Sequence, residues 1–131
     1  MPNSRVVIQA LDYIRLNFSN MQLQVGDIAA EVGLTNNYLS NIFSKETKKT
    51  VLEYITEKRI DYSKKLLKET NLRMYEIAKN SGFSTAETFN RNFKKITGIT
   101  PLEYKNNLKN MWKCQEIIEF NYMQSAFFIL V

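Results

Sequence analysis

The sequence lacks histidine and is poor in cysteine, proline and glycine, with one, two and four of these among 131 residues. Without histidine there is no histidine-based catalytic triad, metal ligand or general base. The single cysteine, Cys114, rules out an intramolecular disulfide framework. Proline and glycine are the residues that most often interrupt helices, so their scarcity favours a chain that is mostly helix with short connections.

Long apolar runs are missing as well. The longest, at residues 126–131, falls far short of the roughly 20 residues that a membrane-spanning helix requires. The first residues, 1–5, lead into an amphipathic segment and not into the apolar centre of a signal peptide. We therefore expect a cytoplasmic protein with no membrane partner.

Arrangements of residues that would support catalysis are also missing. The sequence shows no metal-ligating cluster, no nucleophile beside a base and no glycine-rich phosphate loop. The pairs Glu53/Glu57 and Glu116/Glu119 have helical spacing and are most simply solvated or salt-bridged. Methyl-acceptor chemistry at Cys114 is the remaining enzymatic alternative, and the absence of a cysteine cluster disfavours it. We predict no enzyme, no catalytic residue, no metal and no cofactor.

What the sequence does contain is basic charge. Eighteen Lys and Arg against 13 Asp and Glu give a formal net charge of +5 and a pI of about 9.3. Such a balance favours an anionic partner, either nucleic acid or an acidic membrane surface, although many basic proteins bind neither. Residues 111–131 differ from the rest because they are nearly uncharged and rich in aromatics.

Two stretches of the chain repeat each other. Ile28, Ala29 and Gly33 recur 49 residues later, and a second set of matches recurs 50 residues later. That second set comprises Phe43, Lys45, Thr47, Thr50, Leu52, Glu53 and Tyr54, which match Phe93, Lys95, Thr97, Thr100, Leu102, Glu103 and Tyr104. The repeat predicts two similar structural units. The change of offset falls in the turn or in the first turn of the following helix.

The second unit reads as helix, turn and helix. A short helix ends at a tight turn at Gly82, and a second helix opens at Ser84. Ser84 and Glu87 have the spacing of a capping box, which predicts Ser84 as the N-cap. This arrangement is the geometry of a DNA reader.

The same helix continues to a stop at Gly98. Phe89, Phe93 and Ile96 recur at helical spacing and are predicted to form its buried face. A third helix is expected from Pro101, opened by a second capping box between Thr100 and Glu103.

The first unit follows the same plan. A packing helix is predicted at residues 5–18, with Val7, Ala10, Leu11, Ile14 and Phe18 on its apolar face. Two further helices are predicted within residues 25–45. Thr35 is expected to cap the second of them, and Leu39, Ile42 and Phe43 to form its buried face.

Residues 51–69 contain neither glycine nor proline and predict one long linker helix that Thr50 and Glu53 cap. Its predicted apolar stripe comprises Val51, Leu52, Ile55, Ile60, Leu66 and Leu67. Nineteen helical residues span about 28 Å, close to the roughly 34–36 Å of one DNA turn. The helix could therefore hold two reader helices in successive major grooves, or at an angle that forbids simultaneous insertion.

These motifs carry a family resemblance. I-A-x-x-x-G-F-S at residues 77–84 and F-x-R-x-F-K-K-x-x-G-x-T-P-x-E-Y at residues 89–104 resemble the signature of the AraC/XylS family of bacterial transcription regulators. The resemblance covers about residues 6–108. Three departures are Lys48 in place of a usual glycine, Ser63 in place of alanine, and Thr88 where an aromatic is common.

The resemblance implies an all-α fold of about seven helices, homeodomain-like, with two helix-turn-helix subdomains joined by a long linker helix. We expect the first subdomain at residues 1–50, the linker helix at 51–69 and the second subdomain at 70–108. Residues 109–131 form a tail that is an added helix, a disordered end or a cloning artefact.

Domains of this kind usually follow a ligand-binding or receiver domain. An N-terminal sensory or receiver domain is therefore expected to be missing from this chain. Residues 36–43 resemble the response-regulator branch of the family, and the alternative is a short regulator that stands alone.

The chemistry of the two reader helices predicts which residues contact DNA. The predicted base-contacting residues are Asn36, Asn37, Ser40, Asn41, Ala86, Glu87, Thr88 and Arg91, because asparagine suits adenine and arginine suits guanine. The predicted phosphate-contacting residues are Thr35, Lys45, Lys48, Lys49, Ser84, Asn90, Lys94 and Lys95.

Each assignment has a simpler alternative. Asn36 and Asn37 could merely start a helix, Arg91 could contact a phosphate, and Glu87 is better explained as a cap. The lysines could form a solvated basic face.

The function predicted from these residues is a sequence-specific, AraC-like transcription regulator bound to double-stranded DNA. The alternative is a helical protein-interaction module that docks on RNA polymerase or a partner domain. The two readings are compatible, because the family often recruits polymerase.

Overall fold

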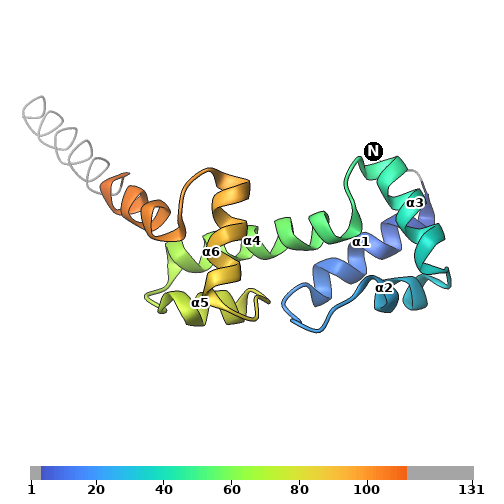
Figure 1. The fold of residues 1–131 in the computed structure, drawn as a ribbon, viewed down its shortest axis with the longest axis horizontal. Coiled ribbons are helices and arrows are strands. Elements are labelled where there is room, and N and C mark those ends of the chain that lie inside the picture. Colours follow the sequence, from blue (N-terminus) through green and yellow to red (C-terminus); the bar gives the residue numbers. More distant parts are fainter. Residues whose placement is uncertain (1–3, 112–131) are drawn as a thin grey trace, which may run out of the picture.

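The computed structural model describes residues 4–111, and all regular secondary structure in that range is helical. The helices are α1 (Arg5–Asn17), α2 (Val25–Val32), α3 (Asn36–Thr47), α4 (Val51–Glu69), α5 (Met74–Asn80) and α6 (Ala86–Thr97), and a further helix begins at residue 101. Figure 1 shows α4 running across the molecule between two groups of helices. The predicted all-α fold with two helix-turn-helix units on a long linker helix is confirmed. Residues 112–131, which include Cys114, Glu116 and Glu119, lie outside the described range.

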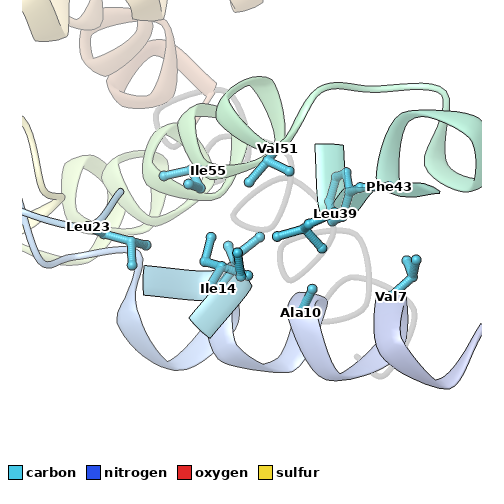
Figure 2. Close-up of a cluster of buried hydrophobic side chains, with 10 residues drawn as sticks. Val7, Ala10, Ile14, Leu23, Leu39, Phe43, Val51 and Ile55 are labelled. Atoms are coloured by element: carbon cyan, nitrogen blue, oxygen red, sulfur yellow. The ribbon is translucent and has the colours of Figure 1, made fainter. Parts of the chain in front are cut away.

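The first group, here the first lobe, consists of α1, α2, α3 and the start of α4. Its core is a continuous cluster of buried apolar side chains from all four helices and from the segment that joins α1 to α2. Its members, most of which Figure 2 labels, are Val7, Ala10, Ile14, Leu23, Ile28, Ala29, Leu39, Phe43, Val51 and Ile55. Three of the residues predicted for the apolar face of the packing helix, Val7, Ala10 and Ile14, are fully buried here. Burial of these faces holds α3 in place with its other face outward.

The second lobe consists of the later part of α4, α5, α6 and the helix from residue 101. Its core contains Ile60, Leu67, Ile77, Ala78, Phe83, Phe89 and Phe93. Because Ile55 belongs to one core and Ile60 to the other, α4 contributes to both lobes as one unbroken helix. The subdomain boundaries given above stay predictions.

The cap predicted for α4 is present. The Thr50 hydroxyl accepts a hydrogen bond from the Glu53 backbone N–H at 3.0 Å, and the Glu53 carboxylate accepts one from the Thr50 N–H at 3.3 Å. Such a reciprocal pair satisfies two backbone donors that a helix start would otherwise leave unpaired. At residue 101, the Glu103 N–H likewise donates to the Thr100 hydroxyl at 3.2 Å.

Two residues predicted to be buried are exposed. Leu52 is 62% exposed, since it lies off the stripe by which Val51 and Ile55 enter the first core. Ile96 is 42% exposed, since it lies in the last turn of α6. The part of α6 that packs on the core, through Phe89 and Phe93, ends before this turn. Both side chains instead line an open cleft of about 330 Å³ between α4 and α6.

Helices α3 and α6 end with the same pattern of hydrogen bonds and backbone conformation. The Thr47 hydroxyl donates to the Phe43 carbonyl at 2.7 Å and accepts from the Lys49 N–H, and the Thr97 hydroxyl likewise donates to the Phe93 carbonyl at 2.8 Å and accepts from the Ile99 N–H. The next residue is left-handed in both, with φ of 63° at Lys48 and 86° at Gly98. Lys48 therefore adopts the left-handed backbone conformation that Gly98 adopts in the second lobe, and the turn before α4 has the same shape as the turn after α6.

The aromatic packing is repeated as well. Phe43 meets Tyr54 edge to face with ring centroids 5.7 Å apart, and Phe93 meets Tyr104 in the same way at 5.5 Å. The first pair packs α3 against α4, and the second packs α6 against the helix that begins at residue 101. The sequence repeat is thus a repeat of three-dimensional contacts.

Candidate DNA-binding interface

The first recognition helix, α3, begins at a threonine cap and is held from behind by two core residues. The Thr35 hydroxyl accepts a hydrogen bond from the Tyr38 N–H at 3.2 Å. Leu39 and Phe43 are fully buried and fix the inner face. This local structure sets the direction in which every other side chain of α3 projects.

Three of the four predicted base-contacting residues of α3 are exposed to solvent. Asn36, Asn37 and Asn41 are exposed and Ser40 is half-buried. Asn37 and Asn41 are one helical turn apart and therefore share a face. In the described part of the chain none of the three asparagine side chains makes a hydrogen bond, which leaves their amides available to a base edge.

The second recognition helix, α6, starts one residue later than predicted. Its N-cap is Thr85, whose hydroxyl accepts from the Thr88 N–H at 3.1 Å and donates to the Thr88 hydroxyl at 2.9 Å. Ser84 therefore lies outside the helix, and the predicted Ser84–Glu87 capping box is wrong. Glu87 falls at the second helical position, where its exposed side chain has no part in the cap.

The sequence held a signal for this register. Thr35 and Thr85 are 50 residues apart, the same offset that relates Phe43 to Phe93. The residue that changes the offset is then Ser84, inserted in the turn. The second unit alone cannot decide the register, because Ser84 and Thr85 are both good caps there.

The outward face of α6 carries both charge signs. Phe89 and Phe93 face the core, while Glu87, Arg91 and Lys94 project from the opposite side and are exposed. Asn90 and Lys95 are exposed beside them. Ala86 and Thr88 are half-buried, and the Thr88 hydroxyl is already engaged in the cap. Of the four predicted base-contacting residues of α6, Glu87 and Arg91 are therefore more exposed to solvent than Ala86 and Thr88.

Six of the eight predicted phosphate-contacting residues form two groups. Lys45, Lys48, Lys94 and Lys95 are exposed, and no carboxylate lies within ion-pair distance of them in the described range. The hydroxyl-bearing pair, Thr35 and Ser84, is exposed at the starts of the two recognition helices.

Lys49 differs because it has a partner. Its ammonium lies 2.6 Å from a carboxylate oxygen of Glu57, on the next helix. The pKa of Lys49 is raised chiefly by the hydrogen bond to Glu57 and, to a smaller extent, by the negative charge of Glu57. A phosphate at this position would have to share or replace Glu57.

Nothing in the described residues indicates a metal centre, since no three carboxylates or thiols gather closely enough to hold an ion. Nor does any helix of residues 4–111 combine the length and apolar character of a membrane span. The arrangement consists of two helix-turn-helix units, each of which presents the exposed polar face of its second helix. It defines a DNA-binding domain with two recognition helices.

Comparisons with known proteins agree with this class. A family profile described as "Helix-turn-helix domain" matches residues 28–107. The Msm operon regulatory protein of Streptococcus mutans is 35% identical over 88 residues, which are 67% of this chain and 32% of that protein. The melibiose operon regulatory protein of Escherichia coli is 33% identical over 99 residues, covering 76% of this chain and 32% of that protein.

A solved structure shares the fold closely. The C-terminal domain of AraT, a response regulator from Geobacillus stearothermophilus, matches with a TM-score of 0.77 and 30% identity, over 79% of this chain and 86% of that one. The chain belongs to the AraC/XylS-type family of helix-turn-helix transcription regulators. It spans about a third of the length of the curated relatives named above.

Proposed function

We propose that this chain regulates transcription by binding one asymmetric duplex site, with α3 and α6 in successive major grooves on one face of the DNA. The observation that carries the proposal is the repeated presentation of the recognition helices. Both α3 and α6 begin at a threonine N-cap, and each has a polar outer face. Each is also held by a buried phenylalanine that packs edge to face on a tyrosine of the following helix. A single 19-residue helix connects the two.

The two recognition helices differ in what they offer to bases. Asn37 and Asn41 of α3 present neutral amides that can pair with adenine, and Arg91 of α6 presents a guanidinium that can pair with guanine. Because the faces differ, the two halves of the site should differ in sequence. One chain would then read an asymmetric site without a second copy.

The lysines supply affinity without sequence preference. Lys45, Lys48, Lys94 and Lys95 flank the outer faces and would contact phosphates on either side of each groove. Each such contact should contribute about 0.9 to the slope of log K against log salt.

Variants of the base-contacting residues test the assignment. On a site selected from random duplexes, Arg91→Ala should relax preference at one base pair of one half, and Asn37→Ala at one base pair of the other. The expected loss at that position is about 1–3 kcal/mol. Arg5→Ala and Asn106→Ala remove a guanidinium and an amide from exposed positions outside α3 and α6 and should leave preference unchanged. Unchanged preference in both test variants would refute the assignment.

A further domain of the intact protein is suggested by the length of the relatives. Because the chain spans about a third of those regulators, we propose that a sensory or receiver domain precedes it in the intact protein. The likeness to the C-terminal domain of a response regulator supports the receiver alternative. Contact with RNA polymerase stays a prediction from the family resemblance, as does a cytoplasmic location.

A further inference from the structure

The two lobes touch each other at one side of α4, around the side chain of Arg59. This half-buried residue lies between Ile55, in the first core, and Ile60, in the second. Its Nε donates a hydrogen bond to the Phe18 carbonyl at 2.7 Å, and its Nη2 donates to the Asn20 carbonyl at 2.9 Å. Both carbonyls belong to the end of α1 and the turn after it, in the first lobe.

The same guanidinium also contacts the second lobe. Its central carbon lies 6.0 Å from the centroid of the Phe83 ring, which packs in the second core. Gly82, which precedes Phe83, lies very close to the end of α1 and to the Arg59 side chain. A Cβ at Gly82 would lie 2.6 Å from the Phe18 carbonyl oxygen and 2.7 Å from the Arg59 Nε. The helix-turn-helix turn of the second lobe is therefore seated on the end of α1.

Arginine has the chemistry that this junction needs. A planar guanidinium offers donors in a fixed fork and an apolar face for an aromatic ring, whereas lysine offers a single mobile ammonium. A positive charge is also favourable at the C-terminal end of a helix, where carbonyl groups are unpaired. Burial lowers the pKa of Arg59, yet a guanidinium remains charged at any pH at which the protein is folded.

A second contact supports the first. The Phe18 ring meets Tyr62 of α4 edge to face at 5.5 Å, one turn along from Arg59. Phe18 is thus held by its carbonyl and by its ring. The end of α1 is fixed to α4 at the place where Gly82 rests on it.

We infer that Arg59 is a positioning residue that fixes the angle between the two lobes and, through it, the base-pair spacing between the two halves of the DNA site. The inference rests on the proposed binding of α3 and α6 in successive grooves. One base pair inserted between the halves moves the second by about 3.4 Å and turns it by about 35°. A rigid pair of lobes cannot follow that displacement, whereas a pair free to rock about α4 can.

A distance measurement without DNA tests the rigidity. Spin labels at Gln9→Cys and Lys79→Cys, both exposed and one in each lobe, are placed in the full chain carrying Cys114→Ser. The distance distribution should be narrow in this background and clearly broader after Arg59→Gln. Lys65→Gln removes the same charge from an exposed position of α4 and should leave the width unchanged. Equal widths for the two glutamine variants would overturn the inference.

A spacing series tests the consequence. Sites with one base pair added or removed between the halves should bind the unmodified chain on the order of tenfold or more weakly than the selected site. Arg59→Gln should reduce that penalty to about threefold or less, while Lys65→Gln keeps it. An undiminished penalty in Arg59→Gln, with each lobe folded by circular dichroism, would refute the role in spacing.

The two measurements separate this inference from the proposed function. If DNA selection yields no two-part site, the proposed function fails, and the distance measurement still decides whether Arg59 holds the lobes together. If Arg59→Gln does not fold, Arg59→Lys replaces it in both measurements. Lysine keeps the charge but cannot reach both carbonyls from one planar group, so an intermediate width is expected. A width equal to that of the unmodified chain would count against the inference.

Discussion

At the residue scale, two glycines hold a left-handed backbone in different surroundings. Gly33 has φ of 75° and open space where a Cβ would stand, whereas Gly82 has φ of 99° and the Phe18 carbonyl oxygen 2.6 Å from that point. The two positions separate the cost of the backbone conformation from the cost of steric contact. Gly33 ends α2 within one lobe, and Gly82 touches the other lobe.

Alanine substitutions should therefore differ in effect. Gly33→Ala should lower the free energy of unfolding by about 1–2 kcal/mol, the cost of a left-handed alanine. Gly82→Ala should lower it by about 2–5 kcal/mol, because overpacking against backbone adds to that cost. Urea unfolding of both variants measures the difference. Equal losses would show that Gly82 is not pressed against α1.

Lys48 is strained by its position. It adopts φ of 63° where the second lobe has Gly98, and it is exposed. Lys48→Gly should raise the free energy of unfolding by about 0.5–1 kcal/mol, since relief of the left-handed strain exceeds the entropy that glycine adds to the unfolded chain.

The same variant should weaken DNA binding at low salt. Its salt slope should fall in magnitude by about 0.9 if Lys48 contacts a phosphate. Salt titrations of binding, paired with urea unfolding, report the two effects separately. A stability gain without any change in slope would remove Lys48 from the phosphate-contacting set.

At the element scale, the start of α6 is decided by one hydroxyl. Thr85→Ala should lower the free energy of unfolding by about 0.5–2 kcal/mol, because the Thr88 N–H loses its acceptor. Ser84→Ala should change it little, since Ser84 lies outside the helix. Thermal or urea unfolding of both variants tests the register. A larger loss at Ser84 would restore the capping box that the sequence predicted.

The helices themselves could largely be predicted from sequence, because their signals are local. Thr50 with Glu53 and the lack of glycine or proline define α4, and the spacing of Phe89 and Phe93 defines the inner face of α6. Leu52 and Ile96 have the same apolar character but are exposed. Leu52 lies off the stripe of Val51 and Ile55, and Ile96 lies in the last turn of α6, beyond the part that packs on the core. Ser84 and Thr85 are both competent caps, so the single unit could not decide between them.

The candidate site was less accessible to sequence reasoning. Most residues predicted to contact DNA lie on α3 and α6, and the others lie next to the ends of these helices. No local pattern, however, reveals that Lys49 pairs with Glu57 across a turn. The contact of Arg59 with the Phe18 carbonyl joins residues 41 positions apart. Such contacts depend on how separate helices pack together, so the spacing of residues within one helix does not predict them.

At the scale of the whole molecule, the Lys49–Glu57 pair limits the positive charge on the side that we propose to face DNA. Glu57→Gln would free the Lys49 ammonium and remove one negative charge near the interface. DNA affinity at low salt should rise, and the salt slope should grow in magnitude by up to about 0.9. Glu69→Gln removes an equal charge from the far end of α4 and should have a smaller effect. Equal effects would indicate a general charge effect only.

The central claim is that one chain reads two successive major grooves. The most direct measurement is selection of bound sequences from a random duplex pool, with the full chain at moderate salt. If one chain reads two grooves, the selection yields one asymmetric motif whose two blocks lie about one helical turn, or roughly 10–10.5 base pairs, apart. A single block, or binding that depends on salt and enriches no sequence, would contradict it.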